Sequence, residues 1–391
     1  MKYDFDKSID RTQALSIKWD PKQRLKTYGE EDILPMGIAD MDFKVAPAIS
    51  KAVQKRAAHE TYGYGYASDE YLQASVDWQK RRNNWDIKPE WIIYTPGVNM
   101  GLVCALEMST EPGDNVIIQS PVYYPYYEYT TITGRNVALD PLINNDGRYE
   151  MDFDKLESLA KDPKTTFMIL CSPHNPVGRM WTKEELETVG KICLENNVMI
   201  AVDEIHSDLI LSKEKFVPYA TVSEELAQNC IICTSPSKTF NLAGLLVADI
   251  IIPNDEIRAR FERKMEPYYL WPGNFGAAAQ IAAYNESEDW LEALLDYLRG
   301  NAQFTADFIA EKMPDVKYRV PEATYLAWLD FRAYGMSTDE LWEFMKHKAK
   351  VATDNGATFS PNGEGDGFQR LNFACPRSQL EEALNRIANA L

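Results

Sequence analysis

The chain has 391 residues, of which 45% are hydrophobic and 26% charged, a composition typical of a folded domain rather than a disordered or membrane-embedded chain. This length predicts two domains, or one large domain with a smaller one attached. The net charge of −18 argues against the basic surface expected of a protein that binds nucleic acid or anionic membranes.

Neither targeting signals nor disulfides are expected. The first ten residues, MKYDFDKSID, contain no apolar segment of a signal peptide, and no run approaches the ~18 apolar residues of a spanning helix. The six cysteines lie mostly within apolar runs, and the C-x-x-C pair Cys230 and Cys233 lies in NCIICTS, which has β-strand character and lacks a second ligand pair. We therefore expect a cytoplasmic protein. With only four histidines, we expect no metal site.

The middle of the chain alternates short apolar runs with helical patterns, which predicts parallel βαβ units. A helix is expected in GVNMGLVCALEMS, after Pro96 and Gly97. Apolar runs without alternation predict strands buried on both faces at 115–120, 166–172, 197–204 and 229–235. Between the second and third of these, Thr182 and Glu185 have the spacing of a capping box, which predicts a crossover helix.

The pattern changes near residue 285. A long helical region begins at Gly276, followed by expected strands in YRVPEATYLAWLDF, a helix in STDELWEFMKHKAK and a strand in QRLNFACP. The segment before residue 45 predicts no sheet of its own. We therefore predict an α/β fold with a large domain at 46–285, whose mostly parallel sheet is flanked by helices, and a smaller α+β domain formed by 1–45 and 286–391.

Polar residues follow the carboxyl ends of the predicted strands, where ligands bind in open parallel sheets. These residues are Asn175, Asp203, His206 and Lys238. A desolvated lysine loses its proton and can form a Schiff base with an aldehyde, and a carboxylate can keep a pyridine nitrogen protonated. This pairing is typical of pyridoxal phosphate (PLP), although a simple Lys238–Asp203 ion pair would explain the two residues equally well.

Further residues are suited to the rest of such a cofactor. Gly97, Val98 and Asn99 stand at an expected helix start, where free N–H groups favour a phosphate, and Ser235 and Ser237 add hydroxyls beside the lysine. Tyr123 follows a strand end and could lie against an aromatic ring. Each feature also has a plain structural explanation, a turn or a packed tyrosine.

The chain resembles PLP-dependent enzymes of the aminotransferase fold, fold type I, and within it the MalY/PatB type of cystathionine β-lyases or C–S lyases. The motifs that carry this resemblance occur in the family's order along nearly the whole chain: GIADMDF, YGYGY, TPGV, PVYYPY, CSPHNPVGRMW, VDEIHSDLI, SPSKTFNLAG and QRLNFACPR.

The resemblance implies a role for each matching residue. Lys238 would hold PLP as a Schiff base and then remove the Cα proton of the substrate. Asp203 would pair with the ring nitrogen, and Asn175 with the phenolic oxygen, which His206 would also contact unless it is a structural histidine. Tyr123 would stack on the ring, with Tyr124 beside the substrate.

The phosphate and the substrate carboxylate complete the implied site. Gly97, Val98, Ser235 and Ser237 would hold the phosphate, joined by a tyrosine from a second subunit, for which Tyr64 in TYGYGY is the favoured candidate; the resemblance thus implies a homodimer. Arg370 would bind the substrate carboxylate, with backbone groups near Ile38 and Ala39. The chain departs from many aminotransferases in reading LLVAD where a phosphate-binding arginine is common, and in placing Ala323 where a glycine is common.

The resemblance implies α,β-elimination, in which cystathionine or another cysteine derivative gives a thiol, pyruvate and ammonia. A class I/II aminotransferase is the alternative, because Lys238 and Asp203 serve both reactions. A non-catalytic protein that kept the fold is a third possibility, which the retained lysine and the lack of a basic extension disfavour.

Overall fold

A seven-stranded sheet forms the centre of the larger part of the molecule. The computed structural model describes residues 3–391, so Met1 and Lys2 of the predicted 1–45 segment lie outside the described residues. In spatial order the strands are β2 (Ile92–Thr95), β10 (Ala248–Ile251), β9 (Cys230–Thr234), β8 (Met199–Asp203), β7 (Thr165–Cys171), β3 (Asn115–Ser120) and β4 (Asn136–Pro141). Only β10 runs antiparallel to its neighbours, which confirms the mostly parallel sheet and its four predicted strands.

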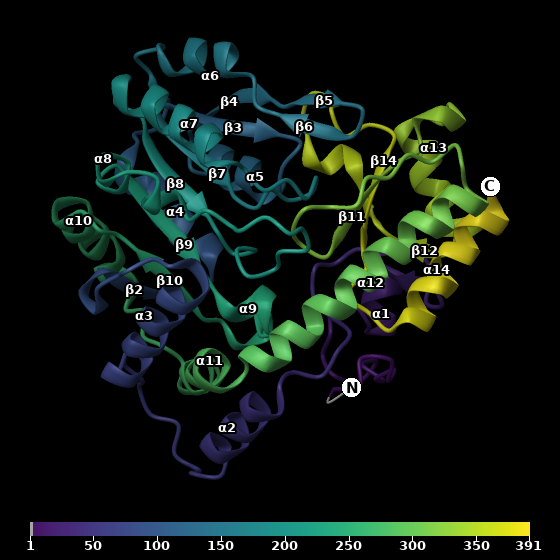
Figure 1. The fold of residues 1–391 in the computed structure, drawn as a ribbon, viewed down its shortest axis with the longest axis horizontal. Coiled ribbons are helices and arrows are strands. Elements are labelled where there is room, and N and C mark those ends of the chain that lie inside the picture. The colour runs from purple at the N-terminus through teal and green to yellow at the C-terminus, as the bar shows by residue number, and fades with distance from the viewer. Residues whose placement is uncertain (1–2) are drawn as a thin grey trace.

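Helices cover both faces of this sheet (Figure 1). One face packs against α4 (Val98–Ser109), α5 (Pro125–Ile132) and α10 (Asp255–Met265), and the other against α6 (Phe153–Ala160), α7 (Lys183–Glu195) and α8 (Glu224–Ala227). Neighbouring strand residues alternate between the two apolar clusters, Ile117 in one and Ile118 in the other, as the period of a strand requires. The predicted capping box of Thr182 and Glu185 starts α7.

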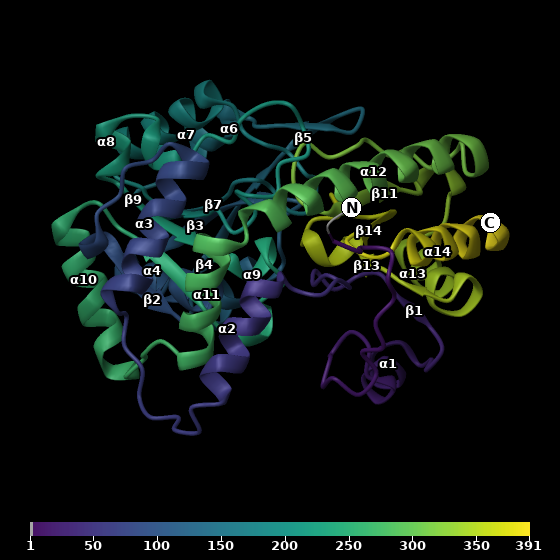
Figure 2. The ribbon, with the colours of Figure 1, turned by 60° about the horizontal axis from the view of Figure 1, so that its bottom comes forward.

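The smaller part is built on a three-stranded antiparallel sheet of β11 (Leu326–Asp330), β14 (Phe368–Asn372) and β13 (Asp354–Asn355). The short strand β1 (Leu34–Pro35) pairs in parallel with β12 (Val351–Ala352), which joins the N-terminal segment to this part. The remaining elements here are α1 (Pro21–Tyr28), α13 (Thr338–Glu343), a π-helical turn (Phe344–Ala349) and α14 (Arg377–Ala390). Figure 2 shows the N-terminal segment and α14 on the same side of the molecule.

One long helix, α12 (Glu288–Lys312), links the two parts. The helices α2 (Pro47–Ala57), α3 (Asp69–Asn83) and α11 (Asn274–Glu286) pack together, and α12 runs from them towards α14 (Figure 1). The long helical region expected from Gly276 is broken at Ser287, whose hydroxyl donates to the carbonyl of Ala282 and whose φ of −123° leaves the helical range. The boundaries at residues 45 and 285 stay predictions.

The strand expected in YRVPEATYLAWLDF is shorter than predicted. Only its second half forms β11, because Pro321 has no N–H for a ladder and Thr324 has a φ of 75°. A hairpin of β5 (Ile143–Asn145) and β6 (Arg148–Glu150) lies beside this part.

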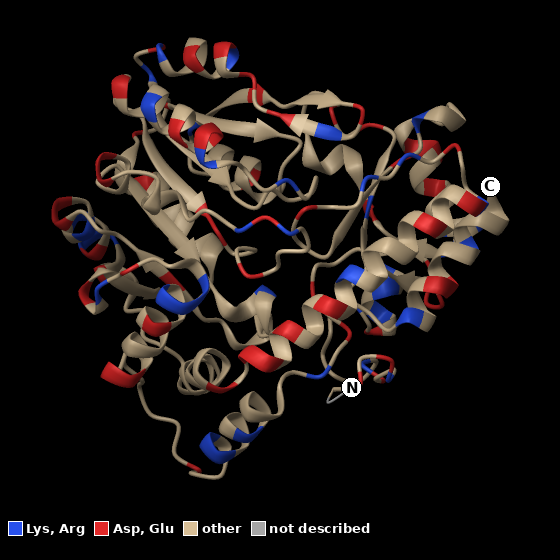
Figure 3. Ribbon diagram, viewed as in Figure 1, with Lys and Arg blue, Asp and Glu red and all other residues tan. Residues whose placement is uncertain are grey.

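Acidic and basic side chains are interspersed over the outer helices of both parts (Figure 3). No helix among residues 3–391 is long and apolar enough to cross a membrane.

Candidate active site

A cavity of about 410 Å³ opens at the carboxyl ends of β7, β8 and β9. It therefore lies at the edge of the parallel sheet where the sequence placed its polar residues. The lining includes nine residues predicted for the site, namely Ala39, Gly97, Val98, Tyr123, Asn175, Asp203, His206, Ser237 and Lys238. Residues from six separate stretches of the chain thus meet in one place.

Lys238 lies on the short helix α9 (Pro236–Thr239), which begins directly after β9. Its Nζ donates to the backbone carbonyl of Ala39 at 2.6 Å. Burial lowers the pKa of Lys238 to about 8, and the positive charge of Arg370 acts in the same direction. With this pKa about a tenth of the amine is neutral at pH 7, far more than for an ordinary lysine, and a nucleophile or base requires this neutral form.

Asp203 ends β8 and is almost fully buried. The Tyr126 hydroxyl donates to its Oδ2 at 2.6 Å, and the Ile205 backbone N–H donates to its Oδ1 at 3.1 Å. Burial raises the pKa of Asp203 in spite of these two bonds. A protonated ring nitrogen placed in the cavity would supply the positive charge that this carboxylate needs to stay ionised.

His206 and Asn175 line the cavity beside Asp203. His206 is buried, burial lowers its pKa to about 3, and its Nδ1 has no hydrogen-bond partner among the described residues. The Asn175 Oδ1 accepts a hydrogen bond of 2.9 Å from Arg370, which leaves the amide NH₂ for a ligand. A neutral imidazole and an amide are suited to hydrogen bonds with a phenolic oxygen.

Arg370 lies on β14 and is buried. Its Nη2 donates to the Gly37 carbonyl at 3.4 Å and also contacts Asp354. Its Nε has no partner within residues 3–391. The guanidinium therefore bonds a residue of the cavity wall, Asn175, and keeps donor capacity for a carboxylate.

The first turn of α4 forms another wall. Gly97 precedes it with a φ of 149°, a value that L residues rarely adopt, and an added Cβ would meet no atom within 4 Å. No side chain of the described chain caps this helix, so its first N–H groups are available to an anion. Ser237 lines the same cavity, whereas the Ser235 hydroxyl donates to the Val247 carbonyl and caps α9.

Three predicted tyrosines lie in different surroundings. Tyr123 lines the cavity, with its ring 5.6 Å from that of Tyr126. Tyr124 lies beside it, at the rim rather than in the cavity wall. Tyr64 is 92% exposed and stands away from this cavity in a single chain, with its ring against Trp271.

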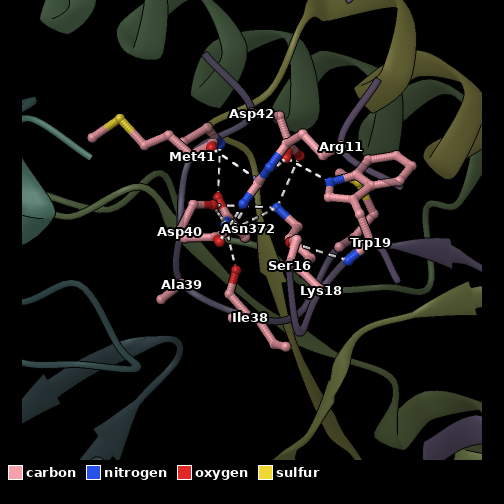
Figure 4. Close-up of polar contacts among 12 residues, drawn as sticks. Arg11, Ser16, Lys18, Trp19, Ile38, Ala39, Asp40, Met41, Asp42 and Asn372 are labelled. Atoms are coloured by element: carbon pink, nitrogen blue, oxygen red, sulfur yellow. Dashed lines mark hydrogen bonds and ion pairs between the residues drawn. The ribbon is translucent and has the colours of Figure 1, made fainter. Parts of the chain in front are cut away.

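The segment 37–42 contacts Lys238 of the cavity on one side and a buried ion network on the other. Figure 4 shows the network. Ala39 faces Lys238, and its carbonyl also accepts a bond of 3.0 Å from Tyr325. Behind it, Asp42 accepts from Lys18 at 2.8 Å and from Arg11 at 2.5 Å. Further bonds fix the backbone of the segment, from Asn372 to the carbonyls of residues 38 and 40 and from Asn241 to those of residues 41 and 43.

These residues fit PLP on structural grounds. The cavity offers an amine for an aldehyde, a carboxylate that needs a cation, an unpaired imidazole nitrogen and an uncapped helix terminus. Sequence reasoning missed Tyr126, which the run PVYYPYYEY does not single out, and the network of Arg11, Lys18 and Asp42. No grouping of three or more His, Cys, Asp or Glu side chains in the described part of the chain is suited to a metal.

Comparisons with known proteins place this geometry in context. Residues 31–387 match the family model for aminotransferase class I and II. Cystathionine beta-lyase PatB of Bacillus subtilis (strain 168) is 42% identical over 99% of both chains. Cystalysin of Treponema denticola, whose structure contains PLP, superposes with a TM-score of 0.95 at 38% identity, covering 100% of this chain and 99% of that one. The PLP-bound C–S lyase of Staphylococcus hominis superposes with a TM-score of 0.93 at 31% identity, over 100% and 98%.

Proposed function

The chain belongs to the aminotransferase class I and II family, and from this we propose that it is a PLP-dependent carbon–sulfur β-lyase. It cleaves cystathionine or related cysteine derivatives to a thiol, pyruvate and ammonia. The observation that carries the proposal is the end-to-end match to a cystathionine β-lyase, in a chain whose Lys238 and Asp203 line one cavity that fits the cofactor.

The side chains of the cavity divide the work of elimination. When bound, PLP draws electrons away from the substrate Cα, which acidifies its proton. Lys238 would hold the cofactor aldehyde and, once released, accept that proton on Nζ, for which a pKa of about 8 is well matched. Asp203 would keep the ring nitrogen protonated, and Tyr126 would hold Asp203 in place. The C–S bond would then break, the sulfur would leave as a thiol with the proton that Nζ accepted, and water would hydrolyse the remaining three-carbon fragment to pyruvate and ammonia.

The α-carboxylate of the substrate would bind Arg370, as the unpaired Nε of this buried guanidinium supports. Two hydrogen bonds orient the Arg370 guanidinium, from Nη1 to Asn175 and from Nη2 to the Gly37 carbonyl. Backbone groups near Ala39 would complete the carboxylate pocket. Tyr124, at the rim of the cavity, would lie beside the substrate.

A homodimer would complete the phosphate end, with Tyr64 donated by the partner. In a single chain several large hydrophobic side chains are exposed, among them Tyr64, Tyr66, Tyr269, Trp271 and Leu246, and the last of these also lines the cavity. Exposed aromatic residues beside a ligand cavity support a surface that a second copy covers. The six cysteines are buried and unpaired, which supports a reducing, cytoplasmic location.

The test is product formation without a keto acid. The holoenzyme incubated with cystathionine alone should release pyruvate and ammonia in equal amounts. A product that forms only after a keto acid is added would identify the aminotransferase alternative, which the family name favours. A protein that shows no visible absorbance from bound cofactor, before or after Lys238→Ala, would favour the non-catalytic alternative.

A further inference from the structure

A second cavity of about 540 Å³ lies between the two parts of the molecule, next to the first. Its walls come from the end of α1, from α5, from α13 and from the chain at residues 354–361. The side chains that matter here are Tyr28, Tyr124, Glu128, Trp342 and Asp354. Nothing in the elimination chemistry described above uses Tyr28, Glu128 or Trp342.

Arg370 joins the two cavities. Its Nη1 bonds Asn175, which lines the first cavity, and its Nη2 contacts Asp354, which lines the second. Tyr124 in the second cavity lies 5.6 Å, ring to ring, from Tyr123 in the first. A substrate whose carboxylate binds Arg370 would therefore lie beside both cavities.

The walls of the second cavity are aromatic and acidic. The Tyr28 and Trp342 rings lie 6.0 Å apart, and Tyr124 forms a further aromatic surface. Glu128 and Asp354 are carboxylates, and none of the lining residues in the described chain is Lys or Arg. Burial raises the pKa of Tyr28, and the nearby charge of Asp354 raises it further, which reflects a negative field.

Two cations beside these walls, Lys346 and Arg370, are already paired. Lys346 lies 5.4 Å from the centroid of the Trp342 ring, and Glu343 binds its Nζ at 2.5 Å. The positive charge of Arg370 is paired with the carboxylate of Asp354. Glu128 forms no ion pair with any described residue, so its charge faces the cavity without a counterion. Aromatic faces and the unpaired carboxylate of Glu128 together favour a cation.

We propose that this second cavity is the subsite for the leaving thiol, and that it favours cysteine conjugates whose thiol carries an ammonium group. The proposal rests on the lyase function proposed above and adds the residues that select the leaving thiol. Glu128 is its specificity-determining charge, and Tyr28 with Trp342 forms its aromatic wall. The amine would approach the ring faces while the sulfur stays beside Tyr124.

The experiment compares three conjugates of similar size with the holoenzyme: S-(2-aminoethyl)-L-cysteine, S-propyl-L-cysteine and S-(2-carboxyethyl)-L-cysteine. An ammonium group also makes a thiol a better leaving group, so the preference of the native enzyme does not decide the question. The decisive quantity is how Glu128→Gln changes the ratio of kcat/KM between the cationic and neutral conjugates, because leaving-group chemistry is the same in both proteins. Glu187→Gln, which removes an exposed charge on α7, is the matched control.

Glu128→Gln should lower the cationic-to-neutral ratio by about fivefold, through KM, and should raise the relative rate with the anionic conjugate. Trp342→Leu should lower the same ratio by removing a ring face. Glu187→Gln should leave every ratio unchanged. Pyruvate release with unaltered ratios in both variants would overturn the subsite and leave the lyase standing. No pyruvate from any conjugate would overturn the lyase function and the subsite together.

Discussion

The segment 37–42 has a buried cluster of charge on each side, and the two clusters differ in how they are paired. On the side shown in Figure 4, Arg11 and Lys18 face Asp40 and Asp42, so two cations meet two anions. Trp19 and Gln379 add hydrogen bonds to Asp42. Every charge on this side has a partner at hydrogen-bond distance.

On the cavity side the charges are incompletely paired. Lys238 has only a neutral carbonyl as its hydrogen-bond partner, Asp203 has a hydroxyl and an N–H, and the His206 Nδ1 has none among residues 3–391. The pKa values follow this difference. Burial alone would lower the pKa of Lys18, but Asp42 and Asp40 raise it above its ordinary value, whereas burial lowers that of Lys238. Ion pairing stabilises the charges of the network side, whereas the incompletely paired charges of the cavity side keep the perturbed pKa values that catalysis uses.

The largest expected effect is the loss of the reactive amine. Lys238→Ala should lower kcat/KM for elimination by about 10⁴-fold, because it removes both the cofactor attachment and the base. Borohydride reduction followed by peptide mapping should place a pyridoxyl label on residue 238 of the native protein and no label on the variant. A label at another lysine would show that the reactive amine lies elsewhere.

The paired side should respond in stability rather than chemistry. Lys18→Met leaves Asp42, whose side chain is 4% exposed, with one counterion fewer and should lower the free energy of unfolding by about 4 kcal/mol. Urea unfolding of the holoenzyme measures this change. Lys26→Met, at an exposed position of α1, should cost less than about 0.5 kcal/mol. An unchanged stability for Lys18→Met would remove the distinction between the two sides.

Asp203→Asn tests the cavity side in the opposite sense. The variant should lose about 100-fold in kcat/KM, because a neutral amide cannot hold a ring nitrogen protonated. Without cofactor it should be at least as stable as the native protein at neutral pH. Burial raises the pKa of Asp203, so the native fold binds the proton of this carboxyl group more tightly than the unfolded chain does. Ionisation of Asp203 therefore lowers the free energy of unfolding of the native protein as pH rises above about 4.

Cofactor-free unfolding curves at pH 5 and pH 8 would check this sign. The stability of Asp203→Asn relative to the native protein should improve from the lower pH to the higher. If the variant is less stable than the native protein at both pH values, the ionised Asp203 stabilises the fold, as the charges of the Lys18 network do.

The cavity side was predictable from the sequence and the paired side was not. Asn175, Asp203 and Lys238 follow apolar strands, and the carboxyl ends of parallel strands meet at one edge, so local pattern implies their proximity. Arg11 and Lys18 lie in a segment without periodicity, and their partners Asp40 and Asp42 are 22 to 31 residues away in the sequence. Nothing local indicates that these side chains are buried together.

Two further features depended on tertiary structure. Tyr126 is one of five tyrosines in PVYYPYYEY, and only the turn of α5 decides which one reaches Asp203. The first half of YRVPEATYLAWLDF was mispredicted because Pro321 and a positive φ at Thr324 interrupt a sequence that otherwise favours a strand. In both cases the path of the backbone decided the outcome, and local sequence preference did not indicate it.

The smallest expected effect compares two lysines in one protein. In the cofactor-free protein, the rate at which added PLP reacts with Lys238 should rise about fivefold from pH 7 to pH 8 and then level off, because a pKa of about 8 sets the neutral fraction. Lys18 should take no label over this range, since Asp42 and Asp40 keep its amine protonated and only 1% of its side chain is exposed. Absorbance gives the rate and peptide mapping gives the site. A rate that keeps rising tenfold per pH unit beyond 9 would mean that Lys238 has an ordinary pKa, and that burial and Arg370 do not set it apart from its paired counterpart.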